Sequence, residues 1–201
     1  MNELTKGMTY VTVYDEPSEV SLTDDHKVKI EDNFLEQKEF DKLQDLMLGG
    51  DLPWYFSPKV VYKNEAANRF QFTHHFYTIN VPTSDFMEQL RPLIEVIRPL
   101  SLWFIKANLL TRTLNIIEDS FHVDFQNDVD NAVLSEKKLK QWTTGIFYVN
   151  TNNGYTKFED GTKVESIANR FVSFSANLRH TGTSCTDEKS RVIINFNYFQ
   201  M

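Results

Sequence analysis

The chain has 201 residues, enough for one sizeable hydrophobic core and too few for two ordinary domains with a linker. Hydrophobic residues make up 41% and charged residues 24%, the balance of a soluble globular protein, so we expect a single domain over residues 1–201. A net charge of −7 repels a phosphate backbone, which disfavours generic nucleic-acid binding. The short basic run Lys137, Lys138 and Lys140 is interpreted as a solvated face.

The cysteine content and the N-terminus indicate a compartment. The single cysteine, Cys185, excludes an internal disulfide framework and any zinc site built mainly from cysteine, and we interpret it as an incidental surface thiol. The first ten residues lack the pattern of a signal peptide, and no apolar run approaches the roughly 20 residues that a membrane-spanning helix needs. These features predict a cytoplasmic protein without membrane association.

Helical spacing dominates the region of about 33–99. A first apolar stripe contains Phe40, Leu43 and Met47, and Gly49 supplies a stop signal behind it. A second stripe follows Pro82 and consists of Phe86, Leu90, Leu93 and Ile97. Pro92 within this stripe predicts a kink or a break. Both stripes predict helices that support a β-core rather than form a second domain.

The region of about 102–199 has the character of β-structure, because aromatic and β-branched residues form short runs between turn residues. The expected strands are 102–113, 121–125, 142–150, 155–159, 164–174, 178–182 and 191–199. This number of short consecutive strands is typical of a sandwich or barrel. We therefore predict a mainly β protein with supporting helices.

Two of the expected strands combine an apolar face with a polar one, because successive side chains alternate between faces. The polar faces consist of Arg191, Ile193, Asn195 and Asn197 in one strand, and of Lys106, Asn108 and Arg112 in the other. Such strands belong either to a sheet exposed to solvent or to a barrel with a polar interior. The pattern alone favours neither.

The triplet His122-Val123-Asp124 places an imidazole and a carboxylate two residues apart, so on a strand both project to the same face. His180 lies 56 residues after Asp124 on another expected strand, and it is the natural third ligand. Two histidines and one carboxylate leave open metal positions for a bidentate oxo-acid and dioxygen, which is typical of non-haem ferrous enzymes. Because a His-x-Asp triplet often arises by chance, the assignment needs a further signal.

Arg191 provides that signal. It follows His180 by 11 residues and opens the last expected strand. A buried guanidinium grips a carboxylate through two parallel hydrogen bonds, as a dicarboxylate co-substrate requires. Had Arg191 stood alone, a salt bridge at the start of a strand would be the preferred interpretation.

With these residues in place, the region of about 102–199 resembles the 2-oxoglutarate/Fe(II)-dependent oxygenases of the prolyl-4-hydroxylase-like type. The matching blocks are 122–124, 143–150, 154–158, 170–174, 179–182 and 191–196. The resemblance implies a double-stranded β-helix (jelly-roll) core and a dioxygenase that hydroxylates its substrate with release of succinate and CO2. Asn153-Gly154 stands where the family often has two glycines, which leaves the turn plausible.

The resemblance also implies roles for individual residues. Fe(II) is the expected cofactor, held at the catalytic centre by His122, Asp124 and His180. The co-substrate is 2-oxoglutarate, and Arg191 is expected to bind its distal carboxylate. Tyr148 matches the family position whose hydroxyl group joins the arginine in that task.

Three further residues are weaker candidates for co-substrate binding. Asn195 shares a strand face with Arg191, and Asn108 or Arg112 could reach the same pocket from the preceding strand. The oxidised substrate stays open between a protein residue, a free amino acid, a small metabolite and a nucleobase, and the oligomeric state is equally open.

Rival interpretations of the same residues are weaker. Val129 and Ser135 stand where a calcium-binding EF-hand loop needs glycine and glutamate. A related halogenase would lack the carboxylate of Asp124. At most one of the adjacent His74 and His75 can join a given site, and ordinary packing is preferred for both. Two questions stay open: whether the loop 126–140 is a lid or a surface insertion, and whether the chain is a β-helix binding module without turnover.

Overall fold

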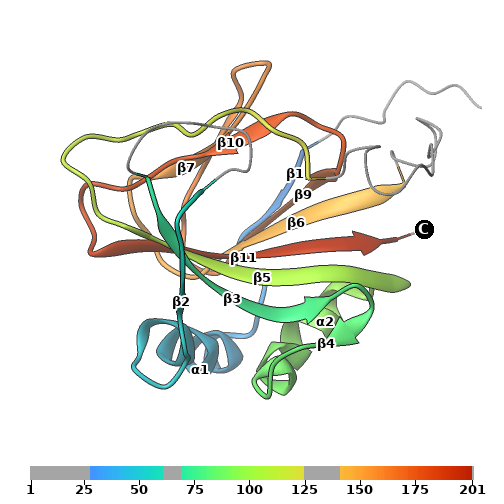
Figure 1. The fold of residues 1–201 in the computed structure, drawn as a ribbon. Coiled ribbons are helices and arrows are strands. Elements are labelled where there is room, and N and C mark those ends of the chain that lie inside the picture. Colours follow the sequence, from blue (N-terminus) through green and yellow to red (C-terminus); the bar gives the residue numbers. More distant parts are fainter. Residues whose placement is uncertain (1–27, 61–68, 125–140, 201) are drawn as a thin grey trace, which may run out of the picture.

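The computed structural model describes residues 28–60, 69–124 and 141–200, which form two antiparallel sheets (Figure 1). The larger sheet has eight strands in the order β1 (Lys29–Glu31), β9 (Arg170–Ser175), β6 (Trp142–Tyr148), β11 (Ser190–Phe199), β5 (Ser101–Thr111), β3 (Gln71–Thr78) and β2 (Tyr55–Ser57), with β4 (Val81–Pro82) paired to β3. The smaller sheet has the order β10 (His180–Gly182), β7 (Tyr155–Phe158) and β8 (Lys163–Glu165).

The helices cover one face of the larger sheet (Figure 1). They are α1 (Gln37–Leu48), the 3-10 turn η1 (Met87–Leu90) and α2 (Arg91–Ile97). The two predicted apolar stripes are confirmed as the buried sides of these elements. Pro92 causes the predicted break, because it lies in the first turn of α2, directly after the 3-10 turn. Within the described residues, no helix is long and apolar enough to cross a membrane.

Alternation along the central strands separates two environments. In β11, Val192, Ile194, Phe196 and Tyr198 belong to the core against the helices. Arg191 and Asn197 belong to the opposite face, which lies toward the smaller sheet, and they are buried with exposed fractions of 1% and 8%. The polar face is therefore enclosed between the sheets, as expected for a β-structure with a polar interior and contrary to the solvent-exposed alternative.

Several strand predictions are corrected. The expected strand 164–174 is two strands, β8 and β9, because Asn169 adopts a left-handed backbone conformation (φ 60°) between them. The side chain of Asn169 bonds the backbone N–H and carbonyl of Leu35, which fixes this turn against the N-terminal region. Residues 121–124 form an isolated bridge at His122 instead of the expected strand.

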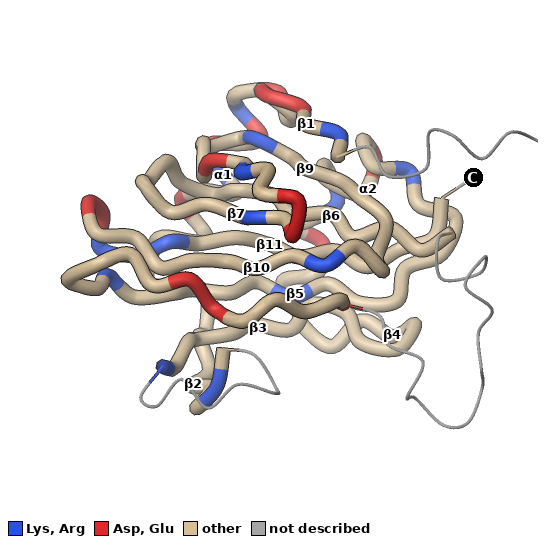
Figure 2. Tube along the Cα trace, turned by 90° about the horizontal axis from the view of Figure 1, so that it is seen from above, with Lys and Arg blue, Asp and Glu red and all other residues tan. Residues whose placement is uncertain are grey.

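The strand β3 was not expected, since helical spacing was extended over the whole region of about 33–99. It joins the larger sheet beside β5. The surface position predicted for Cys185 is also wrong: the thiol is fully buried, and the Sγ atom lies 3.6 Å from the carbonyl oxygen of Glu188. The lysine run 137–140 and the loop 126–140 lie outside the described residues. Figure 2 shows basic and acidic residues interspersed over the described trace.

Candidate metal centre and adjoining pocket

The three predicted ligands come together on two segments of backbone. His180 begins β10, and His122 lies in the connection that follows β5. The two residues exchange backbone hydrogen bonds, from His122 N to His180 O (2.9 Å) and from His180 N to His122 O (3.0 Å). This bridge holds the two imidazole rings with their centroids 4.7 Å apart.

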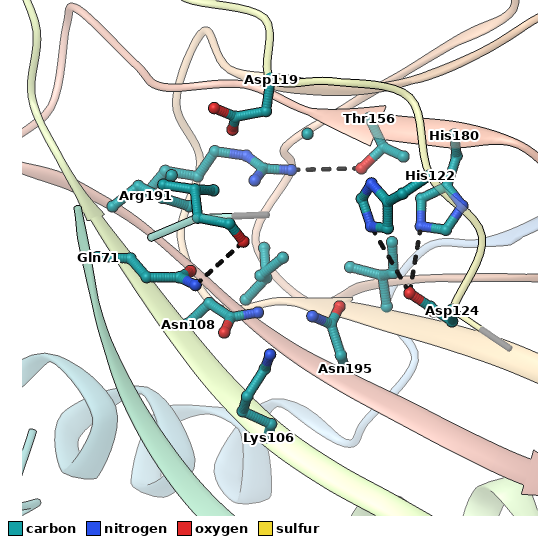
Figure 3. A pocket seen from close by; sticks show the side chains of 15 residues that line it. Gln71, Lys106, Asn108, Asp119, His122, Asp124, Thr156, His180, Arg191 and Asn195 are labelled. Carbon is teal, nitrogen blue, oxygen red and sulfur yellow. Dashed lines mark hydrogen bonds and ion pairs between the residues drawn. The ribbon is translucent and has the colours of Figure 1, made fainter. Parts of the chain in front are cut away.

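The ligand atoms converge on one point (Figure 3). Asp124 Oδ1 lies 3.7 Å from His122 Nε2 and 3.8 Å from His180 Nε2, and all three atoms lie within 4.8 Å of one another. The Nδ1 atoms of the two rings lie 3.1 Å from Ser120 O and 3.0 Å from Leu178 O. Because a carbonyl oxygen only accepts, each Nδ1 carries the proton and each Nε2 presents a lone pair to the centre.

The carboxylate is oriented in the same way. Thr144 Oγ1 and Asn197 Nδ2 donate to Asp124 Oδ2 at 2.7 Å and 3.2 Å, which leaves Oδ1 facing the imidazoles. Burial acts to raise the pKa of Asp124, but the two imidazoles and these two hydrogen bonds outweigh it, so the pKa is lowered and the group is an anion. Burial, with the neighbouring His180, lowers the pKa of His122 and keeps it neutral near pH 7. Two imidazoles that present Nε2 and one carboxylate suit a divalent transition metal with open positions.

A cavity of about 100 Å³ adjoins the triad. Its lining, drawn in Figure 3, consists of Val60, Gln71, Lys106, Asn108, Leu110, Asp119, His122, Asp124, Ile146, Thr156, His180, Gly182, Arg191, Ile193 and Asn195. The larger sheet supplies the floor through β5, β6 and β11, and the smaller sheet supplies Thr156 and His180 from the opposite side. The cavity is therefore lined mainly by polar groups, at a depth where most side chains are apolar.

Arg191 lies in this lining with one donor unmatched. Its Nε donates to Ser166 Oγ (2.8 Å) and its Nη2 to Thr156 Oγ1 (3.3 Å), whereas the buried Nη1 has no hydrogen-bond partner among the described residues. A buried unpaired guanidinium N–H is costly, so the site fits an anionic ligand that accepts a hydrogen bond from Nη1. Gly154 permits this position, because a Cβ atom there would lie 2.7 Å from Arg191 Cδ.

Tyr148 lies beside the guanidinium but behind the cavity wall. Its ring centroid is 5.7 Å from Arg191 Cζ, and its hydroxyl donates to Thr156 Oγ1 (2.8 Å). Burial raises the pKa of Tyr148, so the hydroxyl stays a donor. Thr156 Oγ1 thus accepts from both Tyr148 and Arg191, which leaves its own proton for a group in the cavity. Tyr148 reaches the pocket through Thr156 rather than directly.

Of the three weaker candidates for co-substrate binding, two line the cavity and one does not. Asn108 and Asn195 line the cavity, and the buried Asn108 Oδ1, like Arg191 Nη1, has no hydrogen-bond partner in the part of the chain that the structure describes. Arg112 is exposed and absent from the lining, because β5 ends at Thr111 and the N–H of Arg112 donates to Lys189 O outside the strand. The structure thus brings together seven of the eight predicted site residues. Of these, Tyr148 contacts the pocket only through Thr156. Arg112 does not belong to the site.

Several residues of the site were not predicted. Asn197 and Thr144 hold the carboxylate, and strand alternation could have found them, since each shares a face with a predicted site residue. Lys106 was recognised as part of a polar face but not assigned a role. Thr156 could not be found in this way, because the sequence does not show that β7 lies opposite the larger sheet.

Two other polar clusters have structural partners. The side chain of Asp119 is paired with Arg69 Nη2 at 3.0 Å, and both are largely buried. Burial raises the pKa of Asp119, against the effect of Arg69. His74 is buried, with its ring nitrogens 2.7 Å from Pro53 O and from Ser84 Oγ, so its predicted role in packing agrees with its surroundings.

Comparison with known proteins identifies the fold of the chain. No protein-family model matches the chain, and no curated protein matches it. Among solved structures, it is similar to a prolyl-4-hydroxylase from Pseudomonas putida, with 14% identity, a TM-score of 0.55 and coverage of 87% of this chain and 94% of that one. A prolyl hydroxylase from Trichoplax adhaerens, solved with a hypoxia-inducible factor peptide, is 14% identical, with a TM-score of 0.57 and coverage of 86% and 83%.

HygX from Streptomyces hygroscopicus, solved with nickel, 2-oxoglutarate and hygromycin B, is 10% identical, with a TM-score of 0.57 and coverage of 89% and 84%. At these identities the similarity establishes the fold alone. The predicted fold class is confirmed: the chain is mainly β with supporting helices around a jelly-roll core. The resemblance drawn from the sequence is confirmed at this level.

Proposed function

We propose that the chain is a 2-oxoglutarate-dependent non-haem iron dioxygenase that hydroxylates a substrate and releases succinate and CO2. One observation carries the proposal: a His-Asp-His triad and the unmatched Nη1 of a buried arginine face the same enclosed cavity. A metal-binding set at one end and a carboxylate-binding group at the other fit a small oxo-acid that must bind both.

His122, Asp124 and His180 would hold Fe(II). Their neighbours prepare them for it, since backbone carbonyls fix the tautomer of both rings and Thr144 orients the carboxylate. When bound, the iron supplies the redox chemistry that couples decarboxylation of the oxo-acid to oxidation of the substrate.

Arg191 would bind the distal carboxylate of 2-oxoglutarate through Nη1, joined by the hydroxyl of Thr156. Asn108 and Asn195 extend the polar lining along the floor. Ile146 and Ile193 supply apolar walls, which help exclude water from the bound co-substrate. Each end of a dicarboxylate would therefore meet a group that is already oriented.

The solved structures support the co-substrate and leave the substrate open. HygX is described with nickel, 2-oxoglutarate and hygromycin B bound, whereas the Trichoplax enzyme is described with a peptide. Both share the fold with this chain at 10–14% identity. A protein residue, an amino acid, a metabolite and a nucleobase all stay open as the oxidised group.

The test is anaerobic addition of Fe(II) and 2-oxoglutarate to the purified chain, with visible absorption recorded. We expect a weak charge-transfer band of the iron chelate in the wild type. The His180→Ala variant should lose iron retention, because one of three ligands is removed, while the His75→Ala variant should retain the metal, since His75 is exposed and outside the triad. A folded wild type without the band would refute the cofactor assignment.

Turnover separates an enzyme from a binding module with the same pocket. Succinate formed from 2-oxoglutarate in air should exceed that of His180→Ala, and it should rise further with the correct substrate. A band without succinate under any condition would favour the module.

A further inference from the structure

Lys106 is a charged residue for which the proposed function has no role. It lies on β5 in register with Asn195 of β11 and with His75 of β3, so it occupies the middle of the polar floor. Figure 3 shows its ammonium group pointing into the cavity between Asn108 and Asn195.

Among the described residues, the ammonium group of Lys106 has no acidic partner. No carboxylate of the described ranges lies within ion-pair distance of Lys106 Nζ, which lies 5.7 Å from the centroid of the Phe104 ring. The charge of Asp124 acts on Lys106 from further away, but that carboxylate is held by Thr144 and Asn197 and faces the two histidines. Burial lowers the pKa of Lys106, which reflects the loss of solvation around the charge.

The charge of Lys106 also stays unbalanced when a metal ion and 2-oxoglutarate are bound. Arg69 neutralises Asp119, and a divalent metal with Asp124 and Arg191 balances a doubly charged 2-oxoglutarate. The positive charge of Lys106 is left over. A half-buried charge without a counter-charge is unfavourable, so a further anionic group would be stabilised there.

A second cavity gives such a group room. It encloses about 200 Å³ and shares Val60, Gln71 and Lys106 with the metal cavity. Its other lining residues are Ser57, Pro58, Lys59 and His75, so none of the lining residues is acidic. Lys106 thus lines both cavities, the one that adjoins the triad and the second one.

We propose that Lys106 binds a carboxylate or phosphate group of the substrate, which occupies the second cavity while the carbon to be oxidised faces the metal. This inference rests on the proposed function and narrows its substrate class to anionic molecules. It assigns Lys106 to the substrate and not to the co-substrate, whose carboxylates are already matched by the metal and Arg191.

The experiment uses the full chain loaded with Mn(II) and saturating 2-oxoglutarate, which keeps the site from turning over. Inorganic phosphate and acetate are the two probes, and paramagnetic relaxation of their 31P and 13C-carboxyl signals reports binding near the metal. We expect saturable relaxation for at least one probe. The better probe identifies the anion, a phosphate or a carboxylate.

Three variants make the test specific. Lys106→Met should raise the dissociation constant of the probe at least tenfold and change that of 2-oxoglutarate less than twofold. Lys106→Arg should restore probe binding to within about threefold of the wild type, because the charge is kept. Lys38→Met removes an exposed charge on α1 and should leave probe binding unchanged.

The outcomes against the proposal are distinct. Probe binding that is absent in the loaded wild type, or unaltered by Lys106→Met, would overturn the anionic subsite. A tenfold loss of 2-oxoglutarate affinity in Lys106→Met would assign the lysine to the co-substrate instead. A wild type that binds neither Mn(II) nor 2-oxoglutarate would contradict the proposed function itself, which is a different result.

Discussion

The two faces of the eight-stranded sheet are built from the same strands but differ in role: one forms the apolar core and the other forms the pocket. Toward the helices, Phe147 and Ile194 lie in a continuous apolar core with α1 and α2. Toward the smaller sheet, one residue further along each strand, Asn195 lines the pocket and Tyr148 lies behind its wall, bonded to Thr156. A single alternating pattern therefore places stability on one face and chemistry on the other.

The two faces contribute to the free energy of unfolding in different ways. The helix face gains from burial of apolar area and close packing. The pocket face buries charged and unpaired groups, among them Arg191 Nη1 and Asn108 Oδ1, which disfavour the folded chain until a ligand matches them. Substitutions on the two faces should therefore change different measured quantities.

The largest effect is expected on the helix face. Phe147→Ala should lower the free energy of unfolding by about 3–5 kcal/mol, because a fully buried ring leaves a cavity. Urea denaturation measures the loss, and Val96→Ala, at a half-exposed position of α2, is the control. Metal affinity of the molecules that remain folded should be unchanged, and a loss below about 1 kcal/mol would mean that the helix face is not the main source of stability.

The next effect is expected on the pocket face. Arg191→Met should weaken 2-oxoglutarate binding on the order of 100-fold, because charge-assisted hydrogen bonds of about 1.5–3 kcal/mol each are lost. The free energy of unfolding should change far less than for Phe147→Ala. Calorimetric titration of the Mn(II)-loaded protein measures the affinity, and the exposed Arg112→Met is the matched control. Equal affinities in the two variants would contradict the proposed orientation of the co-substrate.

A smaller effect is expected one contact away from the metal. Asn197→Leu removes a hydrogen bond to Asp124 Oδ2 and should lower metal affinity by about 10–100-fold. Competition with a metal-sensitive dye measures the change. Asn115→Leu, at an exposed position, should have no effect. Should the two asparagine variants bind metal alike, the orientation of the carboxylate would not depend on β11.

The smallest effect has the opposite sign. Lys106→Met should raise the free energy of unfolding of the metal-free protein by about 1 kcal/mol at pH 7, because it removes a half-buried charge that has no acidic partner among the described residues. The pKa of Lys106 is lowered in the folded state, so its charged form is disfavoured there. The gain should therefore shrink as the pH rises toward the ordinary lysine pKa of about 10.4, where the folded wild type loses its proton first. Urea denaturation at pH 7 and pH 10 provides the comparison, and destabilisation at pH 7 would show that Lys106 has a partner.

Local patterns predicted what alternation and spacing encode. The two faces of β11 followed from its residues, and the spacing from Asp124 to His180 to Arg191 indicated the triad and the arginine before any geometry was known. The end of α1 at Gly49 followed from a stop signal.

What could not be predicted depends on contacts between distant segments. Thr156 matters because β7 lies opposite β6, and nothing local to either strand states this. The turn at Asn169 depends on Leu35, 134 residues away. The mixed polar and aromatic sequence of β3 lacks a clean alternation, because both of its faces are partly covered.

The reciprocal backbone bonds between His122 and His180 have a consequence for metal capture. Bringing two ligands together from positions 58 residues apart costs chain entropy, and here folding has already met that cost through the backbone. The separation of the imidazoles is then a property of the main chain rather than of side-chain rotamers. The centre is preorganised, so an arriving ion requires little further rearrangement of the two histidines.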